Sequence, residues 1–204
     1  SLDRDSDGLA DMGKDLQDRA RAAMFSLGAT YPELSGYYPQ PKGLLFPAFL
    51  SVQNLSGIYS PFTIEANYNS AMVSYNLPFT ICHELSHLRG FMQEEEANFI
   101  GFLACVNADD TAFNYSGYLL GWIYATNELY EVDYDTFEEI YNRLSDNVKA
   151  DLSANSNFWK RYDSKVAEVS GQINDHYLKA NGQSDGIKSY DRMVDLMITW
   201  FRSK

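Results

Sequence analysis

The sequence predicts one α+β domain that is predominantly α-helical and carries a small sheet ahead of its central helix. Two observations favour this fold class. Residues 43–76 hold short β-branched and aromatic runs separated by Gly, Pro, Asn and Ser, whereas apolar residues from position 77 onward recur at helical spacing. A length of 204 residues, of which 45% are hydrophobic, suits a single buried core. We therefore treat residues 1–204 as one domain.

The acidic composition restricts the classes of partner. A formal net charge of -12 repels phosphate backbones, so nucleic acid is not expected as a partner. The chain also lacks an apolar run of about 18 residues, the length that a membrane-spanning helix needs. Because the sequence begins at Ser1 without a Met, we expect it to be an excised part of a longer protein.

The first half of the chain predicts one helix, a connector and several short strands. The helix is expected at residues 9–28, and three prolines make residues 31–42 an extended connector. The spacing of Asp3, Asp5 and Asp7 imitates a calcium loop, but Lys14 stands where a bidentate Glu is required. We interpret these residues as a polar segment that leads into the helix. Strands are expected at residues 44–46, 49–52, 57–59 and 62–67.

The second half reads as a series of helices. These are expected at residues 77–90, 93–107, 115–132, 134–144, 148–178 (as one helix or two) and 189–201, with a turn at 182–186. Cys82 and Cys105 both lie in apolar helical contexts and form no CxxC pair. Two buried free thiols are therefore favoured over a disulfide, and a Cys-based zinc site is not expected.

The helix predicted at residues 77–90 contains the motif HExxH, formed by His83, Glu84 and His87. Residues four apart lie on the same face of a helix, so both imidazoles can bind one zinc ion. Glu84 lies off that stripe, where its carboxylate can reach a zinc-bound water and act as a general base. The flanking residues are uncharged, which disfavours a chance match on a solvated helix.

A zinc site of this kind needs a third protein ligand. The pattern HExxHxxGxxH is excluded because its last histidine would fall on Gln93, and Gly90 is better suited to end the helix. Glu94, Glu95 and Glu96 follow, each about 100° from the next around a helix. The stripe below Glu94 holds only small residues, which allow two helices to approach closely. Glu94 is therefore the predicted third ligand, and Asn98, one turn on, is predicted to orient a ligand by a hydrogen bond.

The pair of motifs, HExxH followed by E-x-E-A-N, resembles the gluzincin peptidases in which HExxH precedes E-x-E-A-D. That group includes the CAAX prenyl proteases and related membrane-bound stress proteases. The resemblance implies a zincin-like fold and a zinc-ligand role for Glu94. The final Asp of the motif corresponds to Asn98, where this sequence departs from the pattern.

Three blocks of the chain, at residues 57–69, 77–105 and 177–196, resemble an uncharacterised bacterial family, domain of unknown function 3810. The middle block, LPFTICHELSHLRGFMQEEEANFIGFLAC, is the most specific. The resemblance implies a membrane-anchored zinc peptidase whose anchoring helices precede Ser1 and whose catalytic domain lies outside the cytoplasmic membrane. It implies no particular substrate.

Further site residues can be proposed for a peptidase. The C-terminal block offers Tyr190 and Arg192 as donors to the oxyanion, although a packing tyrosine and a salt-bridging arginine are the alternatives. His176 is more consistent with a surface or capping position. Residues 57–60 or 62–67 could form the sheet edge along which an extended peptide binds.

Together these features predict a zinc-dependent endopeptidase that acts on a peptide or protein substrate. His83, His87 and Glu94 would bind Zn²⁺, and Glu84 would be the general base and later the proton donor. The alternative is a catalytically silent module at the membrane surface, in which a structural zinc supports binding or assembly. An intact Glu84 argues against that alternative, whereas a fourth protein ligand would favour it.

Overall fold

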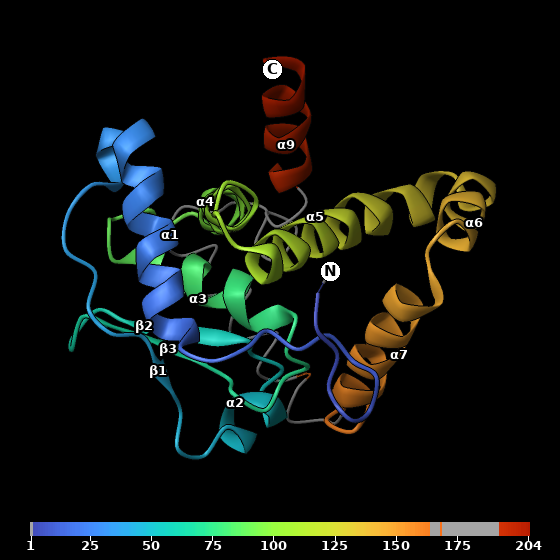
Figure 1. The fold of residues 1–204 in the computed structure, drawn as a ribbon, viewed down its shortest axis with the longest axis horizontal. Coiled ribbons are helices and arrows are strands. Elements are labelled where there is room, and N and C mark those ends of the chain that lie inside the picture. The colour runs from blue at the N-terminus through green and yellow to red at the C-terminus, as the bar shows by residue number, and fades with distance from the viewer. Residues whose placement is uncertain (1, 164–167, 169–191) are drawn as a thin grey trace.

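The computed structural model describes residues 2–163, 168 and 192–204, and helices make up most of this part of the chain (Figure 1). The helices are α1 (Leu16–Thr30), α2 (Ala48–Val52), α3 (Asn76–His87), α4 (Glu94–Val106), α5 (Thr111–Val132), α6 (Tyr134–Asn142), α7 (Asp146–Lys160) and α9 (Arg192–Arg202), with a 3-10 turn at Pro32–Leu34. The predominantly helical fold with a small sheet is confirmed.

The sheet has three short strands in the order β1-β3-β2. Strand β1 (Lys42–Gly43) runs parallel to β3 (Glu65–Tyr68), and β2 (Gly57–Ser60) runs antiparallel to β3 on its other side. Helix α3 packs against β2 and β3, as well as against α1, α4 and α5. The HExxH helix is therefore the central element, as its position between sheet and helices shows in Figure 1.

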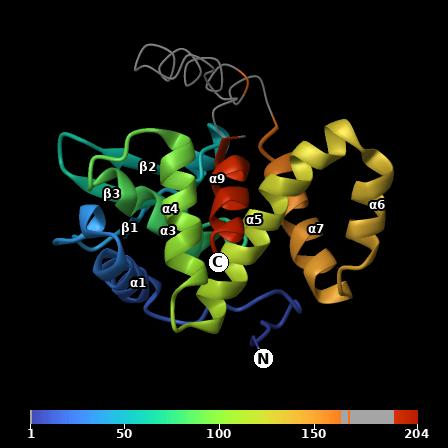
Figure 2. The ribbon, with the colours of Figure 1, turned by 90° about the horizontal axis from the view of Figure 1, so that it is seen from above.

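The main core surrounds α3 and α4. Its fully buried side chains include Ile81 and Leu85 from α3, Cys105 from α4 and Phe113 from α5. Helix α9 lies beside α4 and α5 (Figure 2), and its Met193 and Met197 are buried in the same core. The C-terminal helix is thus part of the domain that carries the HExxH motif.

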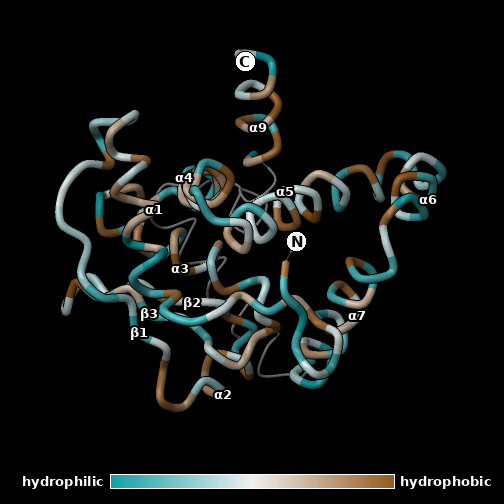
Figure 3. The backbone as a smooth tube through the Cα atoms, viewed as in Figure 1, coloured by the Kyte–Doolittle hydropathy of each residue, from teal (hydrophilic) through white to brown (hydrophobic). Residues whose placement is uncertain are grey.

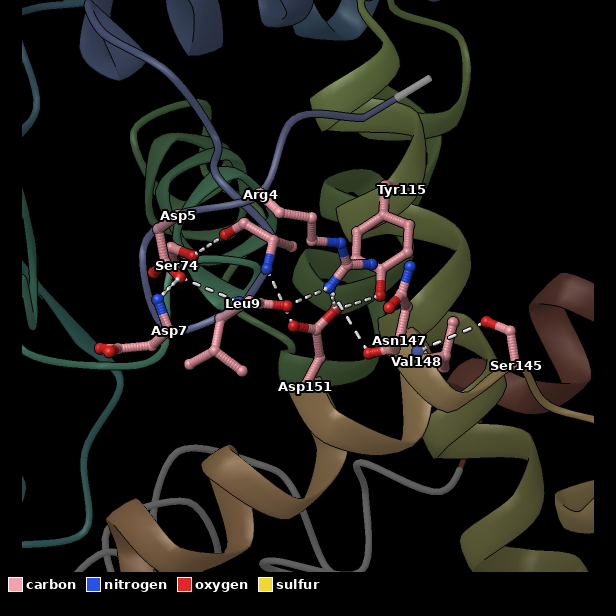
Figure 4. Close-up of polar contacts among 12 residues, drawn as sticks. Arg4, Asp5, Asp7, Leu9, Ser74, Tyr115, Ser145, Asn147, Val148 and Asp151 are labelled. Atoms are coloured by element: carbon pink, nitrogen blue, oxygen red, sulfur yellow. Dashed lines mark hydrogen bonds and ion pairs between the residues drawn. The ribbon is translucent and has the colours of Figure 1, made fainter.

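A second buried feature joins the N-terminal segment to α5 and α7 (Figure 4). The fully buried Asp151 of α7 accepts hydrogen bonds from the Arg4 guanidinium at 2.7 Å, from the Ala10 amide at 2.9 Å and from the Tyr115 hydroxyl. Both carboxylate oxygens are used. We call Arg4, Ala10, Tyr115 and Asp151 the Asp151 cluster.

The prediction of a helix from residue 9 is wrong at its start, because α1 begins at Leu16. Gly13 and Asp15 have φ values of 73° and 57°, in the left-handed region that a right-handed helix cannot pass through. Before them, the Asp5 side chain accepts bonds from the amides of Asp7 and Leu9 and holds a turn. The N-terminal acidic residues therefore shape a loop rather than cap a helix.

Two of the four predicted strands are also wrong. Residues 49–52 lie in the short helix α2, and residues 44–46 form a connection after β1. A short apolar run cannot distinguish a strand from a helix by periodicity, and here Pro47 stands at the N-cap. Figure 3 shows a hydrophobic stretch of chain just before α2. Leu45 and Phe46 precede this helix and are 91% and 80% exposed. The predicted strands at 57–59 and 62–67 correspond to β2 and β3.

The other predicted elements are confirmed only where the structure describes their residues. The 3-10 turn interrupts the connector at 31–42, and the helices predicted between residues 77 and 144 match α3 to α6 with shifted ends. Helix α7 ends at Lys160 and a turn follows at residues 161–162, so the helix expected at 148–178 is interrupted there. Most of its remaining residues, the turn at 182–186, His176 and Tyr190 lie outside the described residues. Cys82 and Cys105 are buried free thiols, as predicted. None of the helices in the described residues has the length and apolar character needed to span a membrane.

Candidate metal centre

The turn between α3 and α4 brings the two predicted motifs face to face. Helix α3 ends at His87, and Gly90 has a φ of 90°, the conformation expected for a residue just past a helix end. Helix α4 then begins at Glu94 and packs along α3. A methyl group added to Gly101 would lie 3.2 Å from the Phe79 carbonyl oxygen and 3.4 Å from His83 Cβ, so the small stripe of α4 does allow close approach.

Three ligand-type atoms converge in this interface. His83 Nε2 lies 3.3 Å from Glu94 Oε2, His87 Nε2 lies 3.8 Å from Glu94 Oε1, and the two Nε2 atoms are 3.2 Å apart. Within the described residues, His83, His87 and Glu94 form the one group of His, Cys, Asp or Glu compact enough to hold a metal ion, with ligand atoms within 4.8 Å of one another. The structure therefore selects Glu94 from the three neighbouring glutamates. Glu96 is exposed, and Glu95 is buried away from this group.

The other nitrogen of each ring indicates how the imidazoles are held. His87 Nδ1 lies 2.7 Å from the Phe91 carbonyl oxygen, which can only accept, so Nδ1 carries the proton and Nε2 keeps its lone pair. This is the arrangement that metal-binding histidines commonly show. His83 Nδ1 and Asn98 Nδ2 are both buried and have no hydrogen-bond partner. Asn98 nevertheless lies close enough to His83 to raise the pKa of its ring, which agrees with the orienting position predicted for it.

The three side chains of this group shift one another's pKa values. Burial disfavours charge on His83, yet the Glu94 carboxylate beside it raises the pKa of His83 to about 9. Burial and the neighbouring His83 charge lower the pKa of His87 to about 4. Although burial opposes the charged form of Glu94, its contacts with both histidines lower the pKa of this carboxyl. A divalent cation would replace the proton shared by these groups.

Glu84 lies next to the ligands but faces the sheet. Its side chain is 6% exposed, and its Oε1 is 4.0 Å from His83 Nε2. Burial, opposed by the His83 charge and reinforced by Glu94, raises the pKa of Glu84 to about 8. Its Oε2 is buried without a hydrogen-bond partner. A carboxylate held in this state can take up a proton near neutral pH.

Comparison with known protein families finds one family that covers most of the chain. The family model described as "Protein of unknown function (DUF3810)" matches residues 2–198. The chain belongs to this family. No curated protein and no solved structure matches the chain.

In this DUF3810 protein the structure adds contacts of three residues that sequence reasoning missed, although residues 57–60 were expected to form a sheet edge. Gly57 of β2 packs directly on Glu84, the ring of Tyr59 lies 5.9 Å from the ring of His87, and Tyr124 of α5 packs on Phe79 at 6.1 Å. Burial, and then the charge of Glu94, raise the pKa of Tyr124. These contacts depend on where β2 and α5 pack, and no local pattern in the sequence signals them.

Of the two predicted oxyanion donors, the structure describes Arg192 but not Tyr190. Arg192 begins α9, and its Nη1 lies 3.5 Å from Glu95 Oε1, an ion pair that ties α9 to the first turn of α4. A salt bridge of this kind is the alternative that the sequence offers to an oxyanion-donor role for Arg192. Arg192 thus pairs with Glu95, the residue that follows the candidate ligand Glu94 on α4. Its role towards a substrate stays a prediction, as does that of Tyr190, which lies outside the described residues.

Proposed function

We propose that this protein is a zinc-dependent endopeptidase. The observation that carries the proposal is the convergence of His83, His87 and Glu94 beside a buried Glu84 carboxylate that is not part of the ligand group. The donor set of two imidazoles and one carboxylate is that of catalytic zinc sites, which keep the fourth position for water or substrate. The proposal rests on this chemistry, because the family itself is of unknown function.

Different residues of the chain would bind the metal ion and transfer protons during peptide hydrolysis. His83, His87 and Glu94 would hold the ion, with His87 oriented by the Phe91 carbonyl. When bound, zinc supplies a water of lowered pKa and polarises the scissile carbonyl. Glu84 accepts the proton of the attacking water and later donates it to the leaving amine.

Strand β2 provides a binding edge for an extended peptide. The Asn69 backbone amide donates to the Ser56 carbonyl at 2.8 Å, so residues 56 and 69 form a hydrogen-bonded pair. Such pairs alternate along an antiparallel ladder, so the next residues of β2 that bond to β3 are 58 and 60. The N–H and C=O groups of Gly57 and Tyr59 therefore point to the other side of β2, where no described strand pairs with them. Because Gly57 and Tyr59 also contact Glu84 and His87, a peptide added along this edge would pass the metal centre.

Several groups could stabilise the oxyanion. Arg192 and Tyr190 remain candidates from the sequence. Further candidates are Tyr59, whose ring lies 5.9 Å from that of His87, and Tyr124, whose pKa is raised by burial and then by the charge of Glu94. A position at the membrane surface, with the site outside the cytoplasm, remains a prediction of the resemblance. It has no bearing on the chemistry proposed here.

The test is cleavage of a peptide library derived from a digested proteome, read by mass spectrometry. We expect zinc-loaded protein to cleave a defined set of peptides, and Glu84→Gln to retain zinc but lose cleavage by at least about 100-fold. Glu96→Gln, an exposed neighbour in the same acidic run, is the matched control and should cleave normally. Full zinc occupancy without any cleavage would instead support the structural-zinc alternative.

A further inference from the structure

Gly57 is the residue of the sheet that comes closest to the candidate base. A methyl group added to its Cα would lie 2.7 Å from both Cγ and Cδ of Glu84, and closer still to Oε1. Carbon atoms in contact normally stay roughly 3.5–4.0 Å apart. The three nearest atoms to this position all belong to Glu84, so the strand backbone and the glutamate side chain are in direct, specific contact.

This contact matters because, among the described residues, the Oε2 atom of Glu84 is buried without a hydrogen-bond partner. Its Oε1 lies 4.0 Å from His83 Nε2. The side chain is therefore oriented by packing between α3 and β2. A glycine inside a strand commonly marks such a close approach of backbone to another group.

We propose that Gly57 is a positioning residue for Glu84, and that its missing side chain sets where the carboxylate lies. This inference rests on the proposed function for its catalytic meaning. The backbone N–H and C=O of the same residue lie on the free edge of β2. Gly57 would thus hold the Glu84 side chain in place and also offer its backbone N–H and C=O to an extended peptide. The distance between the Glu84 carboxylate and the bound peptide would then stay constant.

The first test uses stability and requires neither zinc nor substrate. Gly57→Ala should lower the Tm of metal-free protein by about 3–10 °C, because the added methyl overpacks against Glu84. In a Glu84→Ala background the same change should be neutral or raise the Tm by about 1–4 °C, since alanine is favoured over glycine within a strand. This comparison remains informative if Gly57→Ala alone folds poorly.

Gly43→Ala is the matched control in the neighbouring strand β1. Its added methyl would lie 3.3 Å from Ser70 and Tyr68 atoms and would not meet Glu84. Its effect on Tm should therefore be the same with and without the Glu84 side chain. The inference is overturned if Gly57→Ala likewise costs the same Tm in both backgrounds.

The second test reads the catalytic consequence. Gly57→Ala should still bind one equivalent of zinc, while its kcat on a peptide cleaved by the wild type falls by about 100-fold and its KM changes less. The absorption spectrum of the Co²⁺-substituted variant should match that of the wild type, since the three ligands are unmoved. If the wild type is active and the Gly57→Ala variant is equally active, the positioning role of Gly57 is contradicted while the proposed function stands. A wild type that binds no metal and cleaves nothing contradicts the proposed function, and the Tm comparison then still decides the contact.

Discussion

The Asp151 cluster and the candidate metal centre are both buried groups of charged residues, but only one of them is complete. In the Asp151 cluster, one carboxylate receives a guanidinium, an amide and a hydroxyl, so each oxygen has a partner. In the metal centre, two imidazole nitrogens face each other at 3.2 Å, two glutamates share a small space, and polar atoms of His83, Glu84 and Asn98 have no hydrogen-bond partner. A buried polar group without a partner is costly, so the metal centre is the less satisfied of the two arrangements.

Loss of a carboxylate should therefore change the free energy of unfolding in opposite directions at the two sites. The largest change is expected in the Asp151 cluster. Asp151→Ala should lower the free energy of unfolding by about 3–5 kcal/mol, because Arg4, Ala10 and Tyr115 lose their common acceptor. Urea denaturation followed by circular dichroism measures this. Asp3→Ala, an exposed aspartate of the same N-terminal segment, is the control and should change stability by less than about 0.5 kcal/mol. A small loss for Asp151→Ala would show that the cluster is not the structural tie described here.

In the metal centre, removal of a charge should stabilise the metal-free protein. Burial raises the pKa of Glu84 to about 8 from 4.5, so this group favours folding less and less as the pH rises between those values. Glu84→Gln should therefore gain stability relative to the wild type across that range, by about 2–4 kcal/mol above pH 8. Urea denaturation at pH 5 and pH 8.5 in the presence of a chelator gives the difference. A gain that does not grow with pH would contradict the burial of an ionised Glu84.

The unpaired atoms of Asn98 and His83 provide a finer test. If the amide orients the imidazole, Asn98→Ala should weaken zinc binding by about 10–100-fold without loss of the fold. Asn98→Asp, which restores the residue of the related motif, should bind zinc at least as tightly as the wild type. Competition with a chromophoric chelator measures both affinities. Equal affinities for the alanine variant and the wild type would remove Asn98 from the centre.

The last effect concerns the protons that zinc displaces. Since Glu94 raises the pKa of His83 to about 9, zinc must displace at least one proton below that pH. The affinity for zinc should then fall by about tenfold for each pH unit between 8 and 6. Isothermal titration calorimetry in two buffers with different ionisation enthalpies counts the protons released. Zinc binding without proton release would show that His83 is already neutral in the metal-free protein.

The sequence predicted the grouping of His83, His87 and Glu94 because the relations among these residues are local. His83, Glu84 and His87 are fixed by helical spacing, and the choice of Glu94 follows from the small residues Ala97 and Gly101 on its stripe. The loop at the start of α1 was missed because the left-handed residues Gly13 and Asp15 leave no periodic signal. Helix α2 was missed because a five-residue apolar run fits either secondary structure.

The surroundings of the site could not be predicted from spacing at all. Gly57 and Tyr59 reach Glu84 and His87 only because β2 packs on α3, and Tyr124 approaches Glu94 only because α5 covers both motif helices. Arg192 was noticed in the sequence, but its pairing with Glu95 depends on where α9 docks. Such contacts come from tertiary packing and require the structure.

Metal analysis tests the central claim most directly. Protein purified without chelators, dialysed against zinc and freed of excess ion should contain about one equivalent of zinc, as measured by plasma mass spectrometry. Glu84→Gln should hold the same amount, because Glu84 is not a ligand, whereas His83→Ala and Glu94→Ala should hold almost none. A wild type without bound metal, or a His83→Ala variant that retains a full equivalent, would contradict the metal centre assigned to His83, His87 and Glu94.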